Sequence, residues 1–249
     1  MNKKKQNYKM IISYDGTNYR GWQRLKNDDK SIQFKIERVL SELYKRDIQV
    51  IGSGRTDAGV HAICQIANFH ADNTYSIDEV YEYVNHYLPE DIAIQNVELV
   101  DELFHSRFNV SEKRYQYKIW NGVHSNVFNR KTSYWVKEPL DIDKMKEAAK
   151  QLVGKHDFLG FSTKSKKKNT IRDIYNISIS IEDSMITIDI SGEGFLYNMI
   201  RIIVGTLIEI GQSKKGIDII EQVFKSGNRE DAGYTVPGKG LCMVDVTYK

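Results

Sequence analysis

The sequence predicts a protein of the α+β class, made of two α/β sandwich halves with mixed or antiparallel sheets. Three observations support this prediction. The first half shows the order strand, helix, strand, strand, helix, strand, the second half is similar in outline, and no low-complexity linker separates them. That order is typical of ferredoxin-like sandwiches. We place the halves at residues 1–110 and 111–249, and we expect the functional site in the cleft between them.

Strands in the first half are predicted at residues 8–13, 62–69 and 92–100, with a further apolar run at 48–51. One helix is predicted to begin after Ser31, because its apolar residues share one face. A second begins at Ser76 and Glu79, which form a capping box, and ends before Pro89. These elements account for the ferredoxin-like order.

In the second half, residues 114–120 alternate apolar and polar side chains, which predicts a half-buried strand. Asp141 is expected to cap a helix. Alternating isoleucines at 177–181 and 186–190 flank Asp183-Ser184 and predict a hairpin. A buried helix at 197–210 and a strand at 241–246 complete the half.

Composition limits the class of protein. A chain of 249 residues with 41% hydrophobic content can bury a substantial core. No run approaches the roughly 18 apolar residues of a membrane span, and polar residues follow the basic N-terminus where a signal peptide would be apolar. Cys64 and Cys242, like the histidines, match no metal or redox spacing. We therefore expect a cytoplasmic protein without membrane segment, metal or cofactor.

The net charge is only +3, but basic residues cluster. Such clusters suit phosphate contacts, and the 27 aromatic residues include candidates for stacking on unpaired bases. For the lysine run, a solvated loop is the alternative. The candidate phosphate contacts are Arg24, Arg114, Lys166, Lys167 and Lys168.

The stretch Gly52-Ser53-Gly54-Arg55-Thr56-Asp57-Ala58-Gly59-Val60-His61-Ala62 is the most informative part of the chain. Its glycines predict a tight loop after a strand that presents Arg55 and Asp57 outward. It matches neither a dinucleotide-binding nor a P-loop pattern. An ordinary glycine-rich hairpin, in which Asp57 caps an amide and Arg55 faces water, is the alternative.

Arg201 is a second candidate, because it lies in a helix that is apolar nearly all round. A buried guanidinium requires a partner, and its fork favours a carboxylate. We propose Asp57 as that partner, and Gly205, one turn on, is expected to leave room beside Arg201. The alternative is an arginine that reaches the surface.

The glycine loop resembles the signature of the tRNA pseudouridine synthase A family. Phe161-Ser162-Thr163 and Val236-Pro237-Gly238-Lys239-Gly240 depart from the family pattern. The motifs that resemble the family are Tyr14-Asp15-Gly16-Thr17, Gly21-Trp22-Gln23, Leu88-Pro89-Glu90-Asp91-Ile92, Phe104-His105-Ser106-Arg107-Phe108, Lys113-Arg114-Tyr115-Gln116-Tyr117, His156-Asp157-Phe158, Thr170-Ile171-Arg172, the Arg201 helix and Gly240-Leu241.

The resemblance implies a pseudouridine synthase fold with a central RNA-binding cleft. It implies a homodimer that isomerises uridine to pseudouridine in the anticodon arm of tRNA, at positions 38–40, without a cofactor. Asp57 would be the nucleophile, attacking base or ribose, and Arg201 would orient it. Tyr115 would stack on the flipped uracil, Arg55 would assist flipping, and Leu241 would line the pocket.

Other interpretations remain at this level. A relative with shifted specificity would modify a different uridine or another RNA. A non-catalytic RNA-binding module and a nucleoside hydrolase that uses Asp57 are two further classes. For Tyr115 the alternative is a core tyrosine, since Tyr117 faces the same side by the two-residue period of a strand.

Overall fold

The computed structural model describes residues 5–26, 28–163 and 169–249. The chain forms two compact units, of which unit 1 comprises Met1–Ser111 with Met243–Lys249, and unit 2 comprises Glu112–Cys242. The backbone therefore passes from one unit to the other after Ser111 and again within β10 (Leu241–Tyr248). Each unit combines a sheet with helices, which confirms the α+β class; the boundaries 1–110 and 111–249 stay a prediction.

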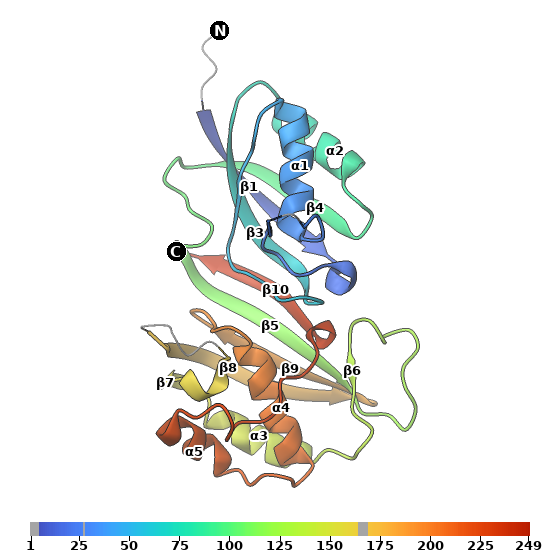
Figure 1. The fold of residues 1–249 in the computed structure, drawn as a ribbon, viewed down its shortest axis with the longest axis vertical. Coiled ribbons are helices and arrows are strands. Elements are labelled where there is room, and N and C mark those ends of the chain that lie inside the picture. The colour runs from blue at the N-terminus through green and yellow to red at the C-terminus, as the bar shows by residue number, and fades with distance from the viewer. Residues whose placement is uncertain (1–4, 27, 164–168) are drawn as a thin grey trace. The chain divides into compact units, whose positions relative to one another are not determined.

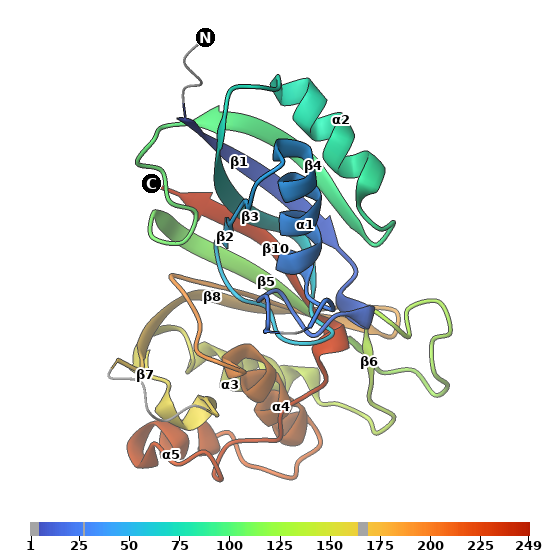
Figure 2. The same cartoon turned by 45° about the horizontal axis from the view of Figure 1, so that its top comes forward.

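Unit 1 has the ferredoxin-like order. Its sheet runs β4-β1-β3-β2, and all neighbouring strands are antiparallel. Figures 1 and 2 show α1 and α2 side by side on one face of this sheet. The elements are β1 (Lys5–Tyr14), α1 (Ile32–Tyr44), β2 (Val50–Gly52), β3 (His61–Asp72), α2 (Ile77–Tyr87) and β4 (Ile92–Val100), with a 3-10 turn at Gly16–Asn18.

The core of unit 1 follows from two periodicities. Alternate residues of β1, among them Tyr8 and Met10, point toward the helices and are buried, as the two-residue period of a strand requires. In α1, Ile32 and Ile36 are buried at a spacing of four, which places them on one helical face. Tyr8 stacks on Phe69 of the adjacent strand, with ring centroids 5.0 Å apart.

Unit 2 also consists of a sheet with helices on one face. Its sheet runs β5-β9-β8-β7 with antiparallel neighbours, and β6 adds a parallel pair with β5. In Figure 1, α3, α4 and α5 lie on one face of this sheet. The elements are β5 (Val110–Trp120), β6 (Tyr134–Trp135), α3 (Ile142–Lys150), β7 (Gly154–Asp157), β8 (Ile171–Glu182), β9 (Met185–Gly192), α4 (Met199–Gly211) and α5 (Ile219–Ser226), with 3-10 turns at Leu159–Phe161 and Gly238–Gly240.

Three helix starts that the sequence predicts are confirmed by their caps. The Ser31 hydroxyl accepts from the amide of Phe34, and Asp141 accepts from the amide of Lys144. Ser76 and Glu79 form the predicted capping box. The predicted hairpin between β8 and β9 is also confirmed, and Asp183 takes the left-handed conformation at its turn, with φ 54°. The sequence pattern does not predict the short elements β6, β7 and α5.

The prediction that Gly205 leaves room beside Arg201 is wrong. A Cβ at Gly205 would lie 1.8 Å from the carbonyl oxygen of Tyr234, so the backbone of the 233–237 segment already fills this space. The Gly233 amide donates to the Thr206 hydroxyl at 2.8 Å, and the Val236 amide donates to the Arg201 carbonyl at 3.3 Å. Gly205 therefore allows a close backbone approach instead of a ligand space.

Gly205→Ala is expected to destabilise the protein, because the added methyl group collides with the Tyr234 carbonyl. In an unobstructed helix the same change stabilises by about 1 kcal/mol, so a loss of about 1–3 kcal/mol or more has the opposite sign. Urea unfolding measures the difference. Gly194→Ala is the matched control, since a Cβ there meets no atom within 4 Å. Equal stability of both variants would contradict the close approach.

Candidate functional site

The loop that carries Asp57 joins β2 to β3, and its first residues are tied to β3. The Ser53 amide donates to the Ile66 carbonyl at 2.7 Å, and the Ser53 hydroxyl donates to Gln65 Oε1 at 2.6 Å. Gln65 Nε2 in turn donates to the Gly54 carbonyl at 3.0 Å. Ser53 and Gln65 are fully buried, so water does not compete for these hydrogen bonds. The bonds therefore fix the start of the loop.

The rest of the loop is braced by the segment that follows β1. The Trp22 amide donates to the Thr56 carbonyl at 3.1 Å, and the Gly59 amide donates to the Tyr19 carbonyl at 3.3 Å. The Tyr14 and Thr56 hydroxyls share a buried hydrogen bond of 2.8 Å. The residue next to Asp57 is therefore held through both its backbone and its side chain.

Glycines make this bracing possible. A Cβ at Gly16 would lie 2.0 Å from the Val60 carbonyl oxygen, and one at Gly21 would lie 2.4 Å from that of Thr56. Gly21 also has a φ of +103°, and Gly59 has a φ of 74°, which side chains rarely allow. The motifs Tyr14-Asp15-Gly16-Thr17 and Gly21-Trp22-Gln23 thus brace the Asp57 loop. Their distance from the loop in the sequence did not indicate this role.

His61, which ends the loop, is a further brace. Its ring is buried, and its Nδ1 accepts from the Gly16 amide at 3.1 Å. The histidine therefore holds the turn at Asp15 and Gly16 against the end of the loop. This contact gives His61 a structural role.

The braced loop presents alternate residues. Thr56 is buried, whereas Asp57 is partly exposed and Arg55 is exposed. Within the described residues, no hydrogen bond or ion pair engages the Arg55 side chain. The backbone carbonyl of Asp57 accepts a hydrogen bond from the Val60 amide at 3.2 Å, which closes a turn. An anion and a cation thus flank an anchored residue, an arrangement suited to acting on a bound molecule.

In unit 2, Arg201 lies in the first turn of α4, among buried neighbours such as Ile200 and Ile202. Its Nε donates to the Val236 carbonyl at 2.7 Å, and its Nη1 donates to Asn198 Oδ1 at 3.0 Å. Asn198 precedes the helix in the left-handed conformation, with φ 61°. Two acceptors of the same unit therefore orient the guanidinium, so it is not a freely solvated side chain.

Tyr117 supports the same segment from β5. Its hydroxyl donates to the Pro237 carbonyl at 2.8 Å, and a Cβ at Gly240 would lie 2.6 Å from its ring. Burial raises the pKa of Tyr117, and the charge of Arg201 lowers it in part. The phenol therefore stays protonated and acts as a donor. The segment that departs from the family pattern, Val236–Gly240, is thus held by Arg201 and Tyr117.

Tyr115 is two residues before Tyr117 and is also buried, at 7% exposure. Its ring meets that of Phe195 edge to face, with centroids 5.4 Å apart.

Arg114, the residue before Tyr115, is exposed, and its Nε lies 2.8 Å from Asp189 Oδ1 of β9. The predicted phosphate contact Arg114 is therefore already paired with a carboxylate.

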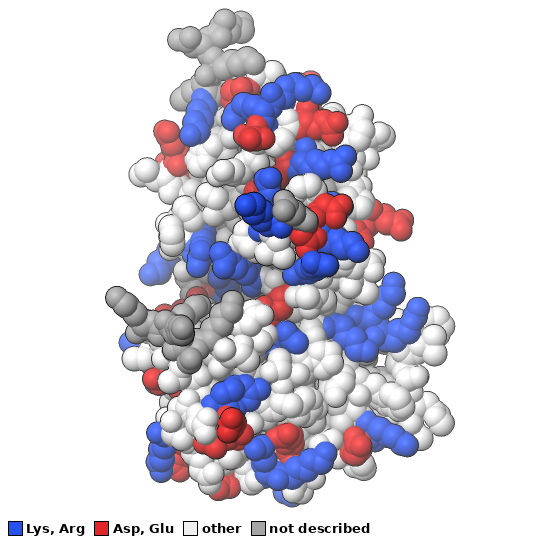
Figure 3. Space-filling view, viewed as in Figure 1, with Lys and Arg blue, Asp and Glu red and all other residues white. Residues whose placement is uncertain are grey.

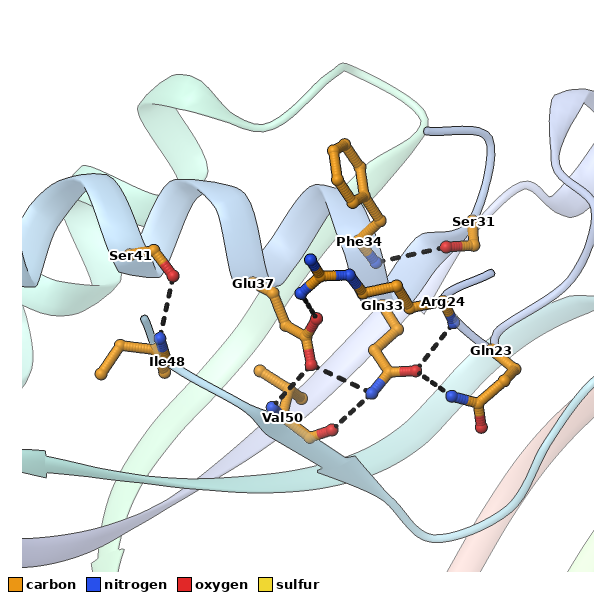
Figure 4. A network of polar contacts seen from close by, with 9 residues as sticks. All are labelled: Gln23, Arg24, Ser31, Gln33, Phe34, Glu37, Ser41, Ile48 and Val50. Atoms are coloured by element: carbon orange, nitrogen blue, oxygen red, sulfur yellow. Dashed lines mark hydrogen bonds and ion pairs between the residues drawn. The ribbon is translucent and has the colours of Figure 1, made fainter. Parts of the chain in front are cut away.

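Arg24 is also engaged within the protein, as Figure 4 shows. Its Nη1 lies 3.1 Å from Oε2 of Glu37, a buried carboxylate of α1 whose Oε1 accepts from the Val50 amide and from Gln33 Nε2, each at 3.0 Å. The guanidinium also lies 5.6 Å from the centre of the Phe34 ring. Arg24 thus neutralises a carboxylate that joins α1 to β2, a role that the sequence did not indicate.

The remaining predicted residues are placed as follows. Leu241 is buried at the start of β10, directly after the turn at Gly238–Gly240. The predicted RNA contacts Lys166, Lys167 and Lys168 lie outside the described residues. Among the residues that are described, no group of three or more His, Cys, Asp or Glu side chains could hold a metal ion. None of the helices in that part of the chain is long and apolar enough to cross a membrane.

Comparison with known proteins identifies the class. The model of a family described as tRNA pseudouridine synthase matches residues 10–109 and 148–249. A relative from Bacillus cereus, named tRNA pseudouridine synthase A 2, is 47% identical over 97% of this chain and 99% of its own length. The tRNA pseudouridine synthase A of Bacillus sp. (strain KSM-64) is 49% identical over the same shares.

A solved structure described as a Cbf5-Nop10-Gar1 complex aligns with 95% of this chain and 48% of that chain, with 10% identity and a TM-score of 0.38. A likeness of this degree carries no argument. The family match and the two relatives are what assign the chain to a family. The chain belongs to the tRNA pseudouridine synthases, isomerases that convert uridine in tRNA to pseudouridine. Within them it belongs to the tRNA pseudouridine synthase A family, which confirms the resemblance and the enzymatic class.

Tyr14→Phe tests the brace beside Asp57. Loss of the bond leaves the buried Thr56 hydroxyl short of one partner, and we expect a loss of about 1–3 kcal/mol in unfolding free energy. Thr56→Val should cost a similar amount. The double variant should be less destabilised than the sum, with a coupling of about 0.5–3 kcal/mol. Urea unfolding of all four proteins measures this, and strict additivity would show that the hydrogen bond contributes nothing.

Proposed function

We propose that the chain isomerises uridine to pseudouridine in the anticodon arm of tRNA, at positions 38–40, with Asp57 as the nucleophile. The observation that carries the proposal is the presentation of Asp57 by a loop that is anchored at both ends. Hydrogen bonds from Ser53, Tyr14 and Trp22 hold the residues around it. A nucleophile on such a loop keeps its position while a substrate base is brought to it.

The reaction breaks the N-glycosidic bond of uridine, rotates the base and rejoins it to the ribose through carbon. It transfers no electrons to or from an outside group, so the chemistry itself calls for no cofactor. The target base is stacked in RNA and has to be flipped out, which costs a few kcal/mol. Arg55, exposed two residues before Asp57, is suited to occupy the space that the base leaves.

Arg201 is proposed to pair with Asp57 and to keep its carboxylate ionised, as a nucleophile requires. A guanidinium carries five N–H donors in a planar fork. Val236 and Asn198 use one donor each on Nε and Nη1, which fixes the plane of the fork. A fork held in this way is suited to a bidentate contact with a carboxylate.

The other proposed roles concern the substrate. Tyr115, held by the ring of Phe195, would stack on the flipped uracil, and Leu241 would line the pocket. Arg24 and Arg114 would contact phosphates together with Lys166, Lys167 and Lys168. A phosphate would have to compete with Glu37 for Arg24 and with Asp189 for Arg114. We further propose that the enzyme acts as a homodimer in the cytoplasm.

A second candidate function is the modification of a different uridine or another RNA. One observation favours it. Where family members usually carry an arginine, this chain has Ser162 and Thr163, whose hydroxyls interact with the Tyr197 carbonyl at 3.2 Å and with Asn198 Nδ2 at 3.0 Å. Asn198 also holds Arg201. A neutral network thus replaces a cation directly beside a proposed catalytic residue.

Asp57→Asn should abolish isomerisation, because it removes the anionic nucleophile while changing little volume. We expect turnover to fall more than about 10³-fold with tRNA binding retained. The measurement is carbodiimide mapping of tRNA from a deletion strain that carries the wild-type chain, Asp57→Asn or a control variant. Asp47→Asn is the control, because Asp47 is an exposed residue of the same unit. Pseudouridine at 38–40 with Asp57→Asn would refute the nucleophile, and pseudouridine elsewhere with the wild type would refute the position.

Arg201→Met should lower kcat by about 10²–10³-fold, since the carboxylate loses the cation proposed to orient it. Arg201→Lys keeps the charge without the fork and should retain more activity than Arg201→Met. Tritium release from labelled tRNA gives kcat, and filter binding gives the affinity. Arg38→Met, at an exposed site on α1, is the control. The pairing is wrong if Arg201→Met turns over as fast as Arg38→Met.

A further inference from the structure

A pocket of about 490 Å³ lies in unit 1 between the end of α1 and the helix α2. Leu43 of α1 and Tyr75 of the segment before α2 form part of its lining, and the remaining lining residues belong to α2 itself. The volume falls in the range of about 300–1,000 Å³ that is common for pockets that hold small molecules. None of the lining residues has a part in the proposed reaction.

Three tyrosine rings form much of the pocket lining. Tyr83 and Tyr87 are one helical turn apart on α2, with ring centroids 4.5 Å apart. Tyr75 is held against α1, because its hydroxyl donates to the Leu43 carbonyl at 3.2 Å and its ring meets that of Tyr44 edge to face at 5.4 Å. These contacts position the rings before a ligand arrives, which lowers the entropic cost of binding.

The carboxylates of Glu79 and Glu82 line the same pocket. The Ser76 amide and hydroxyl donate to Glu79 Oε2 at 2.8 and 2.9 Å, and these hydrogen bonds lower the pKa of Glu79, which therefore stays ionised at neutral pH. Burial and the negative charge of Glu42 on α1 raise the pKa of Tyr83. The electrostatic potential at the rings is thus set by carboxylates from both helices.

The charge of α2 has one sign. Its residues 77–87 include Asp78, Glu79 and Glu82 but neither lysine nor arginine. Figure 3 shows acidic side chains among the basic ones over α1 and α2. A phosphate backbone requires a basic surface, so this part of unit 1 suits a cation better than it suits RNA.

The combination of rings and carboxylates indicates an organic cation. The face of an aromatic ring attracts a cation because its quadrupole is negative there, and the same face packs on methylene groups. Two carboxylates in one pocket favour a ligand with more than one positive charge. A metal ion is the less suitable ligand, since the described part of the chain has no group of three His, Cys, Asp or Glu side chains that could hold one.

We propose that the pocket between α1 and α2 binds a linear aliphatic polyamine. Its ammonium groups pair with Glu79 and Glu82, and its methylene chain lies against the rings of Tyr83 and Tyr87. The site is independent of the reaction at Asp57. Because the ligand binds the folded pocket, it also stabilises the protein against unfolding.

Isothermal titration calorimetry with spermidine tests the proposal on the RNA-free enzyme, since RNA phosphates would themselves bind the cation. We expect saturable binding of one spermidine per chain. Tyr83→Leu removes a ring, and Glu82→Gln removes a charge with little change in volume. Each variant should raise the dissociation constant of spermidine by at least about 3-fold.

Tyr81→Leu and Glu102→Gln are the matched controls. Tyr81 is a tyrosine of α2 that does not line the pocket, and Glu102 is an exposed glutamate elsewhere in unit 1. Both variants should bind spermidine as the wild type does. Circular dichroism of all four variants verifies the fold, and the exposed position of Glu82 keeps the test valid if Tyr83→Leu is poorly folded.

Three results would overturn the proposal. The first is the absence of saturable spermidine binding by the wild type, including the case in which an oligolysine peptide binds instead and a protein segment is the partner. The second is equal weakening in Glu82→Gln and Glu102→Gln with Tyr83→Leu unchanged, because the ligand then responds only to overall charge. The third is a Tyr83→Leu variant that binds spermidine normally but tRNA more weakly, which would make RNA the partner.

Discussion

The close approach of two backbone segments in unit 1 is the constraint on which the Asp57 loop depends. The segment after β1 lies so near the loop that side chains at Gly16 and Gly21 would overlap the carbonyls of Val60 and Thr56. This proximity lets the Trp22 amide reach the Thr56 carbonyl. Glycine is needed at these positions because any Cβ would push the loop outward. The carboxylate that the loop presents therefore depends on residues that take no part in chemistry.

Unit 2 uses the same principle around Arg201. The 233–240 segment lies on α4 at Gly205 and under the ring of Tyr117 at Gly240. Its carbonyls then become acceptors for the guanidinium of Arg201 and the hydroxyl of Tyr117. In unit 1 an irregular loop carries Arg55 and Asp57, and neighbouring segments hold it. In unit 2 the arrangement is reversed, since Arg201 and Tyr117 stand on a helix and a strand and the irregular segment supplies their acceptors.

Much of the fold could be predicted from the sequence, and the reason is local. The caps of α1, α2 and α3 depend on residues within one turn, and the hairpin of β8 and β9 depends on alternation and a two-residue turn. The partners of Arg24 could not be predicted in this way. Its ion pair with Glu37 arises because the segment before α1 folds back along the helix. The space beside Gly205 could not be predicted either, because the backbone of Tyr234, far away in the sequence, fills it.

The sequence by itself determined the family, the order of elements and the loop that carries Arg55 and Asp57, because these are properties of adjacent residues and short periods. Only the tertiary structure decided which groups hold that loop: Tyr14 on Thr56, His61 on Gly16 and Gln65 on Gly54. It also decided that Tyr75 is held on Leu43 and lines one pocket with Tyr83. These outcomes depend on which distant backbones come within hydrogen-bonding distance, and packing of the whole unit sets that distance.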